Sequence, residues 1–176
     1  TAVGYNSLAL NTTGTQNTAV GANALDANTT ANNNTAIGYF TLSANTTGAR
    51  NSALGDATLS VSTTGNDNAG FGAFSLSANT TGSQNTACGA FALNKNTTAN
   101  NNTALGYLTL FDNTTGANNV AIGKDALENN TTANDNVAIG RESMQANTTG
   151  GQNTAVGNLS LYSNQTGVDN CAFGQE

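Results

Sequence analysis

One pattern governs this chain: a 17-residue unit that repeats without insertion or deletion. Glycine occurs at residue 4 and then at every seventeenth residue up to residue 174. The unit reads Asn-Thr-Ala-(Val/Ile/Leu)-Gly-x-x-(Ala/Ser/Thr)-Leu-x-x-Asn-Thr-Thr-(Gly/Ala)-x-x, and its positions are numbered 1 to 17 from Asn17. A fixed short period indicates a repeat architecture in which each unit is one structural element. We therefore expect residues 1–176 to form a single repeat array without separate domains.

The unit predicts β-structure and not helix. Glycine or asparagine recurs within every helical turn, and Asn-Thr-Thr is poor helix material. Glycine at position 5 supplies a corner with positive φ, and asparagine at positions 1 and 12 suits corners because it tolerates the left-handed region. Positions 1–4 and 8–10 then form short strands that stack in register about 4.8 Å apart. The expected fold is all-β: a parallel β-solenoid, or β-roll, of about ten 17-residue coils.

A second, weaker period spans two units. Position 16 is asparagine in alternate coils, at Asn32, Asn66, Asn100 and Asn134. Either a two-coil unit was duplicated, or one full turn of the solenoid takes two units. We favour duplication with one turn per unit, because the apolar columns do not alternate.

The charged residues indicate which positions face water. All fourteen lie at positions 6, 7, 10, 11 and 17. We therefore expect leucine at position 9 and the apolar residue at position 4 to point inward. Stacking also predicts the pairs Arg50 over Asp67 and Lys95 over Asp112, while Lys124 over Arg141 is a like-charge stack with acids beside it.

Position 3 would then point outward, because side chains alternate along a strand. It is alanine in ten of eleven coils and glycine in the other. A thin solenoid buries few large side chains per coil, so an uncharged alanine column suits burial against another chain. The alternative is that alanine is a short filler on an exposed face.

The two cysteines have structural interpretations. Cys88 at position 4 is most simply a core residue, and Cys171 replaces the usual threonine at position 2. They lie about five coils apart, roughly 24 Å at the ladder spacing. This exceeds the Cα separation of about 7 Å that a disulfide bond allows, so we expect no bond within one chain.

Composition argues against several function classes. The chain has no histidine, which removes the Ser-His-Asp triad and nearly all zinc and copper sites. Its net charge is −6 with four basic residues, which argues against nucleic-acid binding. No apolar run approaches the length that a bilayer span needs, so no membrane insertion is expected, and the acids lack the spacing of a calcium loop. We expect no enzyme activity, catalytic residue, cofactor or metal.

The Asn-Thr-Thr segments match the N-glycosylation motif. The alternative, which we favour, is a ladder of asparagine corners with stacked threonines. The possible glycosylation sites are Asn11, Asn28, Asn45, Asn79, Asn96, Asn113, Asn130, Asn147 and Asn164.

Two segments resemble a known family. Residues 119–126 (Asn-Val-Ala-Ile-Gly-Lys-Asp-Ala) and 136–143 (Asn-Val-Ala-Ile-Gly-Arg-Glu-Ser) are similar to the head repeats of trimeric autotransporter adhesins and to related repeats of bacteriophage tail fibres. The resemblance covers the chain through a five-residue motif, although the family's repeat is shorter and lacks the Asn-Thr-Thr-Gly segment. It implies a trimeric, left-handed, surface-exposed β-roll with an adhesive role and without catalytic residues.

The predicted function is a structural, non-enzymatic fibre or adhesin shaft on a cell surface, outside the cell or on a virion. We expect self-association into trimers or filaments, with a host-surface glycan or receptor as a possible partner. Because the first and last coils look like the middle ones, we also expect further coils, caps or end-to-end stacking.

Two alternatives remain open. The first is an ice-binding protein that uses threonine columns at positions 2, 13 and 14. The second is a carbohydrate-active solenoid, either lectin or lyase, with aromatic side chains at one corner that stack sugars. These side chains are Tyr39, Phe40, Phe74, Phe91, Tyr107 and Phe111.

Overall fold

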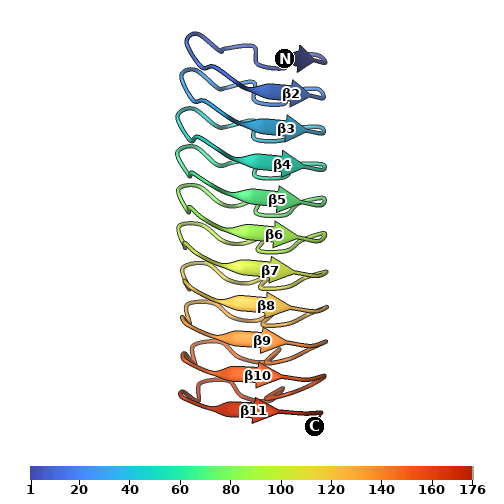
Figure 1. Ribbon diagram of the computed structural model, residues 1–176, viewed down its shortest axis with the longest axis vertical. Coiled ribbons are helices and arrows are strands. Elements are labelled where there is room, and N and C mark those ends of the chain that lie inside the picture. Colours follow the sequence, from blue (N-terminus) through green and yellow to red (C-terminus); the bar gives the residue numbers. More distant parts are fainter. Residues whose placement is uncertain (176) are drawn as a thin grey trace.

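The computed structural model describes residues 1–175 as a straight rod of stacked coils (Figure 1). Each coil contributes one strand of two or three residues, at repeat positions 2 to 4. The strands are β1 (Ala2–Val3), β2 (Thr18–Val20), β3 (Thr35–Ile37), β4 (Ser52–Leu54), β5 (Ala69–Phe71), β6 (Thr86–Cys88), β7 (Thr103–Leu105), β8 (Val120–Ile122), β9 (Val137–Ile139), β10 (Thr154–Val156) and β11 (Cys171–Phe173).

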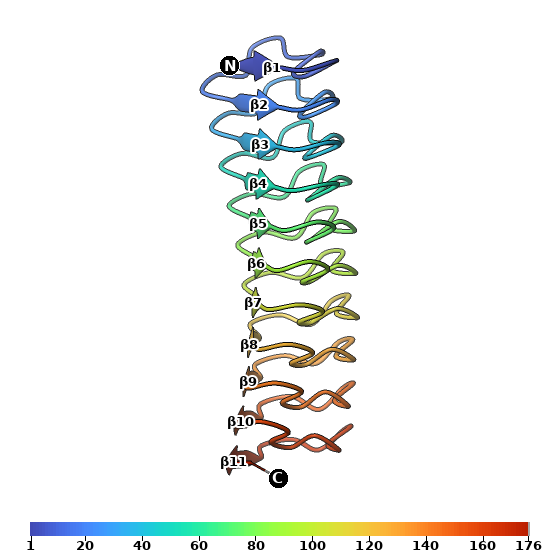
Figure 2. The ribbon, with the colours of Figure 1, turned by 90° about the vertical axis from the view of Figure 1, so that its right-hand side faces the viewer.

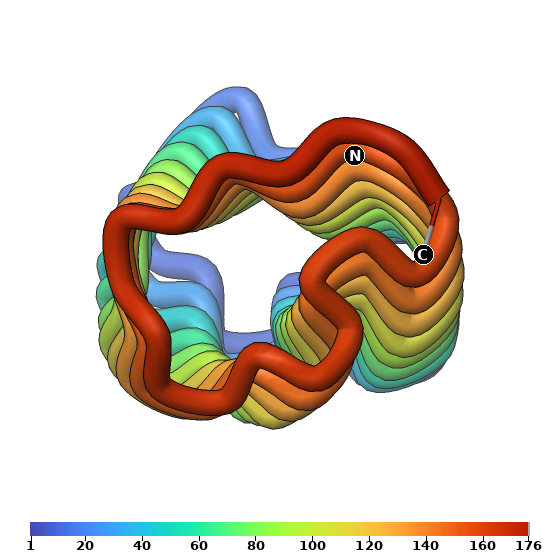
Figure 3. Tube along the Cα trace, turned by 90° about the horizontal axis from the view of Figure 1, so that it is seen from below, coloured from blue at the N-terminus to red at the C-terminus, as the bar shows by residue number. Residues whose placement is uncertain are grey.

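All eleven strands form one parallel sheet in sequence order. Each residue pairs with the residue 17 positions along the chain, as Thr86 does with Thr103. The 17-residue turn and the parallel β-solenoid are therefore confirmed. Seen from the C-terminal end, the chain runs clockwise as it approaches the viewer, so the coil is left-handed (Figure 3). The strands rotate gradually along the rod (Figure 2), as the ordinary twist of sheets requires.

The second predicted strand, at positions 8–10, is wrong. These residues form turns, and the chain enters the left-handed region at positions 7, 9 and 17 of every complete coil, as at Phe91, Leu93 and Asn101. Alternating left-handed residues curl the backbone too tightly for a ladder of extended strands. The glycine corner at position 5 is confirmed, with φ between 118° and 142°.

The leucine column at position 9 is buried, as predicted: Leu25 to Met144 have no exposed surface. The inward direction predicted for position 4 is wrong. Alanine at position 3 points inward instead, and position 4 points outward. The space beneath the strand is shallow: at Gly70 even an added Cβ would lie 2.7 Å from Thr58 Cγ2, closer than van der Waals contact allows, and 3.5 Å from Leu59 Cδ1.

The other part of the interior is polar and is built from two asparagine columns. Neither column lies in the left-handed region, so that part of the corner prediction for positions 1 and 12 is wrong. At position 1, each side-chain oxygen accepts the backbone N–H of the next asparagine, as from Asn102 to Asn85 at 3.0 Å. Its Nδ2 donates to the carbonyl of position 15, as from Asn85 to Ala99 at 2.8 Å.

The position 12 column forms a ladder of amides. Asn113 Nδ2 donates to Asn96 Oδ1 at 3.0 Å, and Asn130 Nδ2 donates to Asn113 Oδ1 at 2.9 Å. Each Nδ2 also donates to the position 15 carbonyl of its own coil, as from Asn113 to Gly116 at 2.9 Å. Both columns thus converge on one carbonyl per coil, and these hydrogen bonds permit the burial of polar groups.

Ser62 interrupts this ladder. The serine hydroxyl is too short to continue the chain of amides, so Ser62 Oγ and Asn45 Oδ1 are buried without a hydrogen-bond partner. On the far side, Asn79 Nδ2 keeps only its bond to Gly82 O, at 3.0 Å.

The two-coil period has a local explanation. The asparagine at position 16 accepts a hydrogen bond from the backbone N–H of the preceding coil. Asn134 Oδ1 accepts from Ala117 N at 2.7 Å, and Asn100 Oδ1 accepts from Ser83 N at 2.7 Å. This bond occurs once in every two coils, whereas the buried columns of the core repeat in every coil.

Candidate functional site: the strand face

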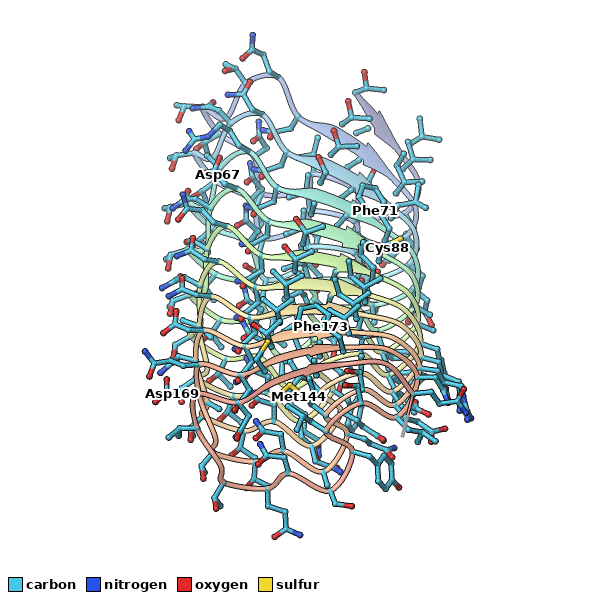
Figure 4. All side chains as sticks on the ribbon, turned by 60° about the horizontal axis from the view of Figure 1, so that its bottom comes forward. Asp67, Phe71, Cys88, Met144, Asp169 and Phe173 are labelled. Carbon is cyan, nitrogen blue, oxygen red and sulfur yellow. The ribbon has the colours of Figure 1, made fainter. Side chains whose placement is uncertain are left out.

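The outward side chains of positions 2 and 4 form one continuous surface, which we call the strand face. Position 4 is apolar in every coil and stays partly or largely exposed, for example 46% at Leu54 and 36% at Leu105. In Figure 4, Phe71, Cys88 and Phe173 lie on the outer side of the strands, whereas Met144 lies within the coils. The position 4 column comprises Val3, Val20, Ile37, Leu54, Phe71, Cys88, Leu105, Ile122, Ile139, Val156 and Phe173.

No charged residue lies on the strand face. Two columns border it: the start edge, at position 17 before each strand, and the end edge, at position 6 after it. Charges begin at these edges, as with Asp67 and Asp169 at the start edge (Figure 4). The rod thus exposes an apolar strip over all its coils, and such strips mark interaction surfaces in soluble proteins.

The core position predicted for Cys88 is wrong, because position 4 points outward. Cys88 and Cys171 are both exposed and free. The strand face therefore carries two thiols at widely separated heights, and the prediction that they do not pair within the chain is confirmed.

The predicted charge stacks are present at the corners. Arg50 Nε donates to Asp67 Oδ1 at 2.6 Å, and Arg50 Nη2 donates to Asp67 Oδ2 at 2.9 Å. This hydrogen bonding from Arg50 lowers the pKa of Asp67 below its ordinary value and raises that of Arg50. Lys95 Nζ donates to Asp112 Oδ1 at 2.6 Å.

Lys124 and Arg141, predicted to form a like-charge stack, are each paired with the acid that follows them in the sequence. Lys124 donates to Asp125 at 2.7 Å, and Arg141 donates to Glu142 at 2.7 Å. The hydrogen bond to Asp125 raises the pKa of Lys124 above its ordinary value. Asp125 departs from the expected exposure of position 7: it is 6% exposed, and its Oδ1 has no partner.

The aromatic side chains predicted to share a corner do so in part. Phe74 and Phe91 stack with ring centres 5.3 Å apart at 8°, and Tyr107 and Phe111 each form a T-shaped pair with Phe91. Lys95 Nζ lies 4.8 Å from the Phe111 ring centre. Tyr39 and Phe40 form a separate pair. Phe91 is packed against other rings, so it is not presented as an open platform of the kind that sugars stack on.

The three threonine columns differ in what they present to solvent. At position 13, the hydroxyl donates to the backbone carbonyl of the next coil, as from Thr97 to Thr114 O at 3.0 Å. Position 14 is exposed, and position 2 lies partly buried on the strand face. The hydroxyls of position 13 are therefore already hydrogen-bonded to backbone carbonyls within the rod.

The structure places the asparagines of the possible glycosylation sites inside the coils. Seven of them, from Asn28 to Asn147, have no exposed surface, while Asn11 and Asn164 are half-buried. Their Nδ2 groups, where a glycan would attach, donate hydrogen bonds within the ladder, as from Asn96 to Asn79 at 2.8 Å. A glycan on a folded coil would have to displace these bonds.

Within residues 1–175, no cluster of three or more potential metal-ligating side chains occurs. Over the same residues, no helix is long and apolar enough to cross a bilayer. A cleft at the last coil is lined by Leu161, Tyr162, Ala172 and Phe173, and it continues the interior leucine and alanine columns.

The strand face was missed at the sequence level, although the sequence held a signal for it. Position 3 is nearly invariant, whereas position 4 varies from cysteine to phenylalanine. A closely packed interior tolerates little change in volume, so the variable column belongs outside and the invariant one inside.

Comparison with protein families, characterised proteins and solved structures finds no match. The β-solenoid expected from the adhesin-like motif is confirmed by the coordinates. The relationship to that family stays a prediction.

Proposed function

We propose that this chain is a structural, non-enzymatic rod, a segment of a fibre or adhesin shaft, that assembles side by side with copies of itself through the strand face. The observation that carries the proposal is the uncharged apolar column at position 4, partly or largely exposed along all eleven strands. An isolated coil stack leaves this column in water, and burying it between copies supplies the driving force for assembly.

The regularity of the rod supports a mechanical role. Every coil has the same length, so no long loop extends from the stack to form a catalytic cleft. The acids at Asp67 and Asp112 are engaged in ion pairs. We propose an extracellular, cell-surface or virion location, in keeping with the motif shared with adhesins and tail fibres, and a trimer or longer filament as the assembled form.

Lysine substitutions on the strand face test the proposal. Leu54→Lys combined with Leu105→Lys should dissociate the assembly, because two charges per copy would be buried without partners. Val61→Lys is a matched control, since Val61 is 42% exposed but lies at a corner, off the strand face. Sedimentation equilibrium should give oligomers for the unsubstituted and Val61→Lys proteins and monomers for the double variant. A monomeric unsubstituted protein at all concentrations would refute the proposal.

A second candidate is ice binding, which the threonine column at position 2 beside the aliphatic column at position 4 favours. Both columns repeat at the regular spacing of a β-ladder. The threonine column is interrupted by Ser52, Ala69, Val120, Val137 and Cys171, and the aliphatic one by Phe71, Cys88 and Phe173. Thermal hysteresis at millimolar protein would support this function, and its absence would remove it.

A glycan or receptor on a host surface remains a proposed partner. The aromatic corner cluster of Phe74, Phe91, Tyr107 and Phe111 is an apolar patch beside the strand face, with Tyr107 on the end edge. Glycan-array binding that is lost in Phe91→Ala would assign the partner to this corner, and binding that is unaffected would place it elsewhere.

A further inference from the structure

Two buried side-chain oxygens without a hydrogen-bond partner lie in adjacent coils of the amide ladder. Within residues 1–175, Asn45 Oδ1 and Ser62 Oγ make no hydrogen bond, and both residues have no exposed surface. The other buried side-chain atoms of this kind lie in other columns, at Asp26, Ser75 and Asp125. Asn45 and Ser62 therefore mark one place in the interior where two polar groups need the same partner.

The regular part of the ladder shows which bonds an asparagine makes at position 12. Asn113 Nδ2 donates to Asn96 Oδ1 in the preceding coil at 3.0 Å and to Gly116 O in its own coil at 2.9 Å. Asn113 Oδ1 accepts from Asn130 Nδ2 in the following coil at 2.9 Å. Each amide thus donates two hydrogen bonds and accepts one.

The groups that would make these three bonds are all present around Ser62. Asn45 Nδ2 donates to Asn28 Oδ1 in the preceding coil at 3.0 Å, so the oxygen of the same amide faces the coil of Ser62. Asn79 Nδ2 would lie 3.2 Å from a Cβ added to Gly65, so this amide reaches the coil of Ser62 from the other side. Two acceptors, Asn45 Oδ1 and Gly65 O, and one donor therefore converge on the space beside the serine hydroxyl.

We infer that one water molecule binds beside Ser62 and replaces the missing amide of the ladder. The water donates to Asn45 Oδ1 and to Gly65 O, whose second lone pair is free beside its bond from Asn51 at 2.8 Å. It accepts from Asn79 Nδ2 and from the Ser62 hydroxyl, so one molecule satisfies both unpartnered oxygens. The shorter serine side chain frees space for about one water molecule, and a buried water needs two to four polar partners.

The corner beside Ser62 gives this water a path to solvent. From Leu10 to Ala146, the backbone N–H of every other position 11 residue donates to the position 10 carbonyl of the next coil, as from Ala78 to Asn94 at 3.0 Å. Within the described residues, Val61 N–H makes no such bond, and Val61 is 42% exposed. The interior water therefore exchanges with solvent through the corner at Val61.

A crystal structure that resolves ordered water tests the site. The unsubstituted protein should show a solvent peak within hydrogen-bond distance of Asn45 Oδ1, Gly65 O and Asn79 Nδ2. In Ser62→Asn the amide should occupy this place, and the peak should be lost. A well-ordered unsubstituted protein without the peak would overturn the inference, as would a peak that persists in Ser62→Asn.

Asn113→Ser is the matched variant, because it creates the same interruption beside a closed corner. Asp112 N–H donates to Glu128 O at 2.9 Å, so a water that binds in this variant lacks the path found at Val61. After correction for intrinsic rates, the backbone amide of Ser62 should exchange its hydrogen about tenfold faster than the amide of residue 113 in the variant, because one hydrogen bond between coils is missing at the Val61 corner. Equal exchange rates would overturn the path through this corner.

Discussion

At the residue scale, the distinctive feature is the column of left-handed residues at position 9, which is leucine in every coil except at Met144. Its members have φ near 50°, and from Leu25 to Met144 the column is sealed from solvent. A left-handed backbone costs an ordinary residue about 1–2 kcal/mol, whereas burying a leucine side chain gains about 1.5–3 kcal/mol. Each coil therefore accepts backbone strain because the side chain fills the interior.

This balance predicts that branching at the Cβ of the position 9 side chain affects stability more than the volume of that side chain does. Leu93→Ile should destabilise the fold by at least about 1 kcal/mol more than Leu93→Met, because a β-branched residue disfavours positive φ. Methionine is already tolerated at this position, with Met144 at φ 52°. Urea unfolding of both variants measures the difference, and equal midpoints would contradict the strain argument.

At the scale of the element, the amide ladder is the feature that distinguishes one coil from another. Seven links join neighbouring asparagines at position 12, and the ladder is broken only at Ser62 within the described residues. A buried polar atom without a partner costs about 1–3 kcal/mol.

Completing the ladder should stabilise the rod. Ser62→Asn supplies a donor for Asn45 Oδ1 and an acceptor for Asn79 Nδ2, so we expect a gain of about 1 kcal/mol. The reciprocal variant Asn113→Ser creates a gap elsewhere and should lose at least as much. Thermal unfolding of the pair gives both values, and a Ser62→Asn protein less stable than the unsubstituted one would show that the asparagine does not fit.

The repeat period, the parallel ladder and the leucine column could be predicted because they depend on spacing and residue type alone. The charges could not show which side of the strand faces inward, since neither position 3 nor position 4 carries a charged residue. Which of the two faces inward depends on the depth of the interior beneath the strand, which Thr58 and Leu59 fill up to Gly70. The asparagine ladders were missed as interior structure because asparagine in a repeat ordinarily indicates a turn.

At the scale of the whole molecule, the interior polarity comes mainly from neutral amides and hydroxyls rather than ionisable groups. Stability should therefore change little across neutral pH, with its limits set by surface ion pairs. Asp67 has a lowered pKa in the folded state, so its contribution is present above the unfolded pKa and is lost as the pH falls through the folded one. Lys124 has a raised pKa, so its contribution is present below the unfolded pKa and is lost as the pH rises through the folded one.

The expected profile is a urea midpoint that is nearly constant from about pH 5 to 9 and declines on either side, given ordinary pKa values of about 3.9 and 10.4 for these residue types. Arg50→Gln should lower the midpoint at neutral pH slightly and leave it unchanged in strong acid, where Asp67 is protonated in both proteins. A steep change in the midpoint between pH 6 and 8 would contradict this account.

The uniform register between neighbouring coils has a consequence for how the length of the rod can evolve. Each coil meets the next through the same ladder, so removing residues 85–101 joins position 17 directly to position 1 of the following coil. The product should still fold, shorter by the spacing of one ladder step, about 4.8 Å. In-frame gain or loss of one repeat in the gene would therefore adjust the reach of the rod stepwise while preserving its cross-section, which makes length a freely evolvable trait.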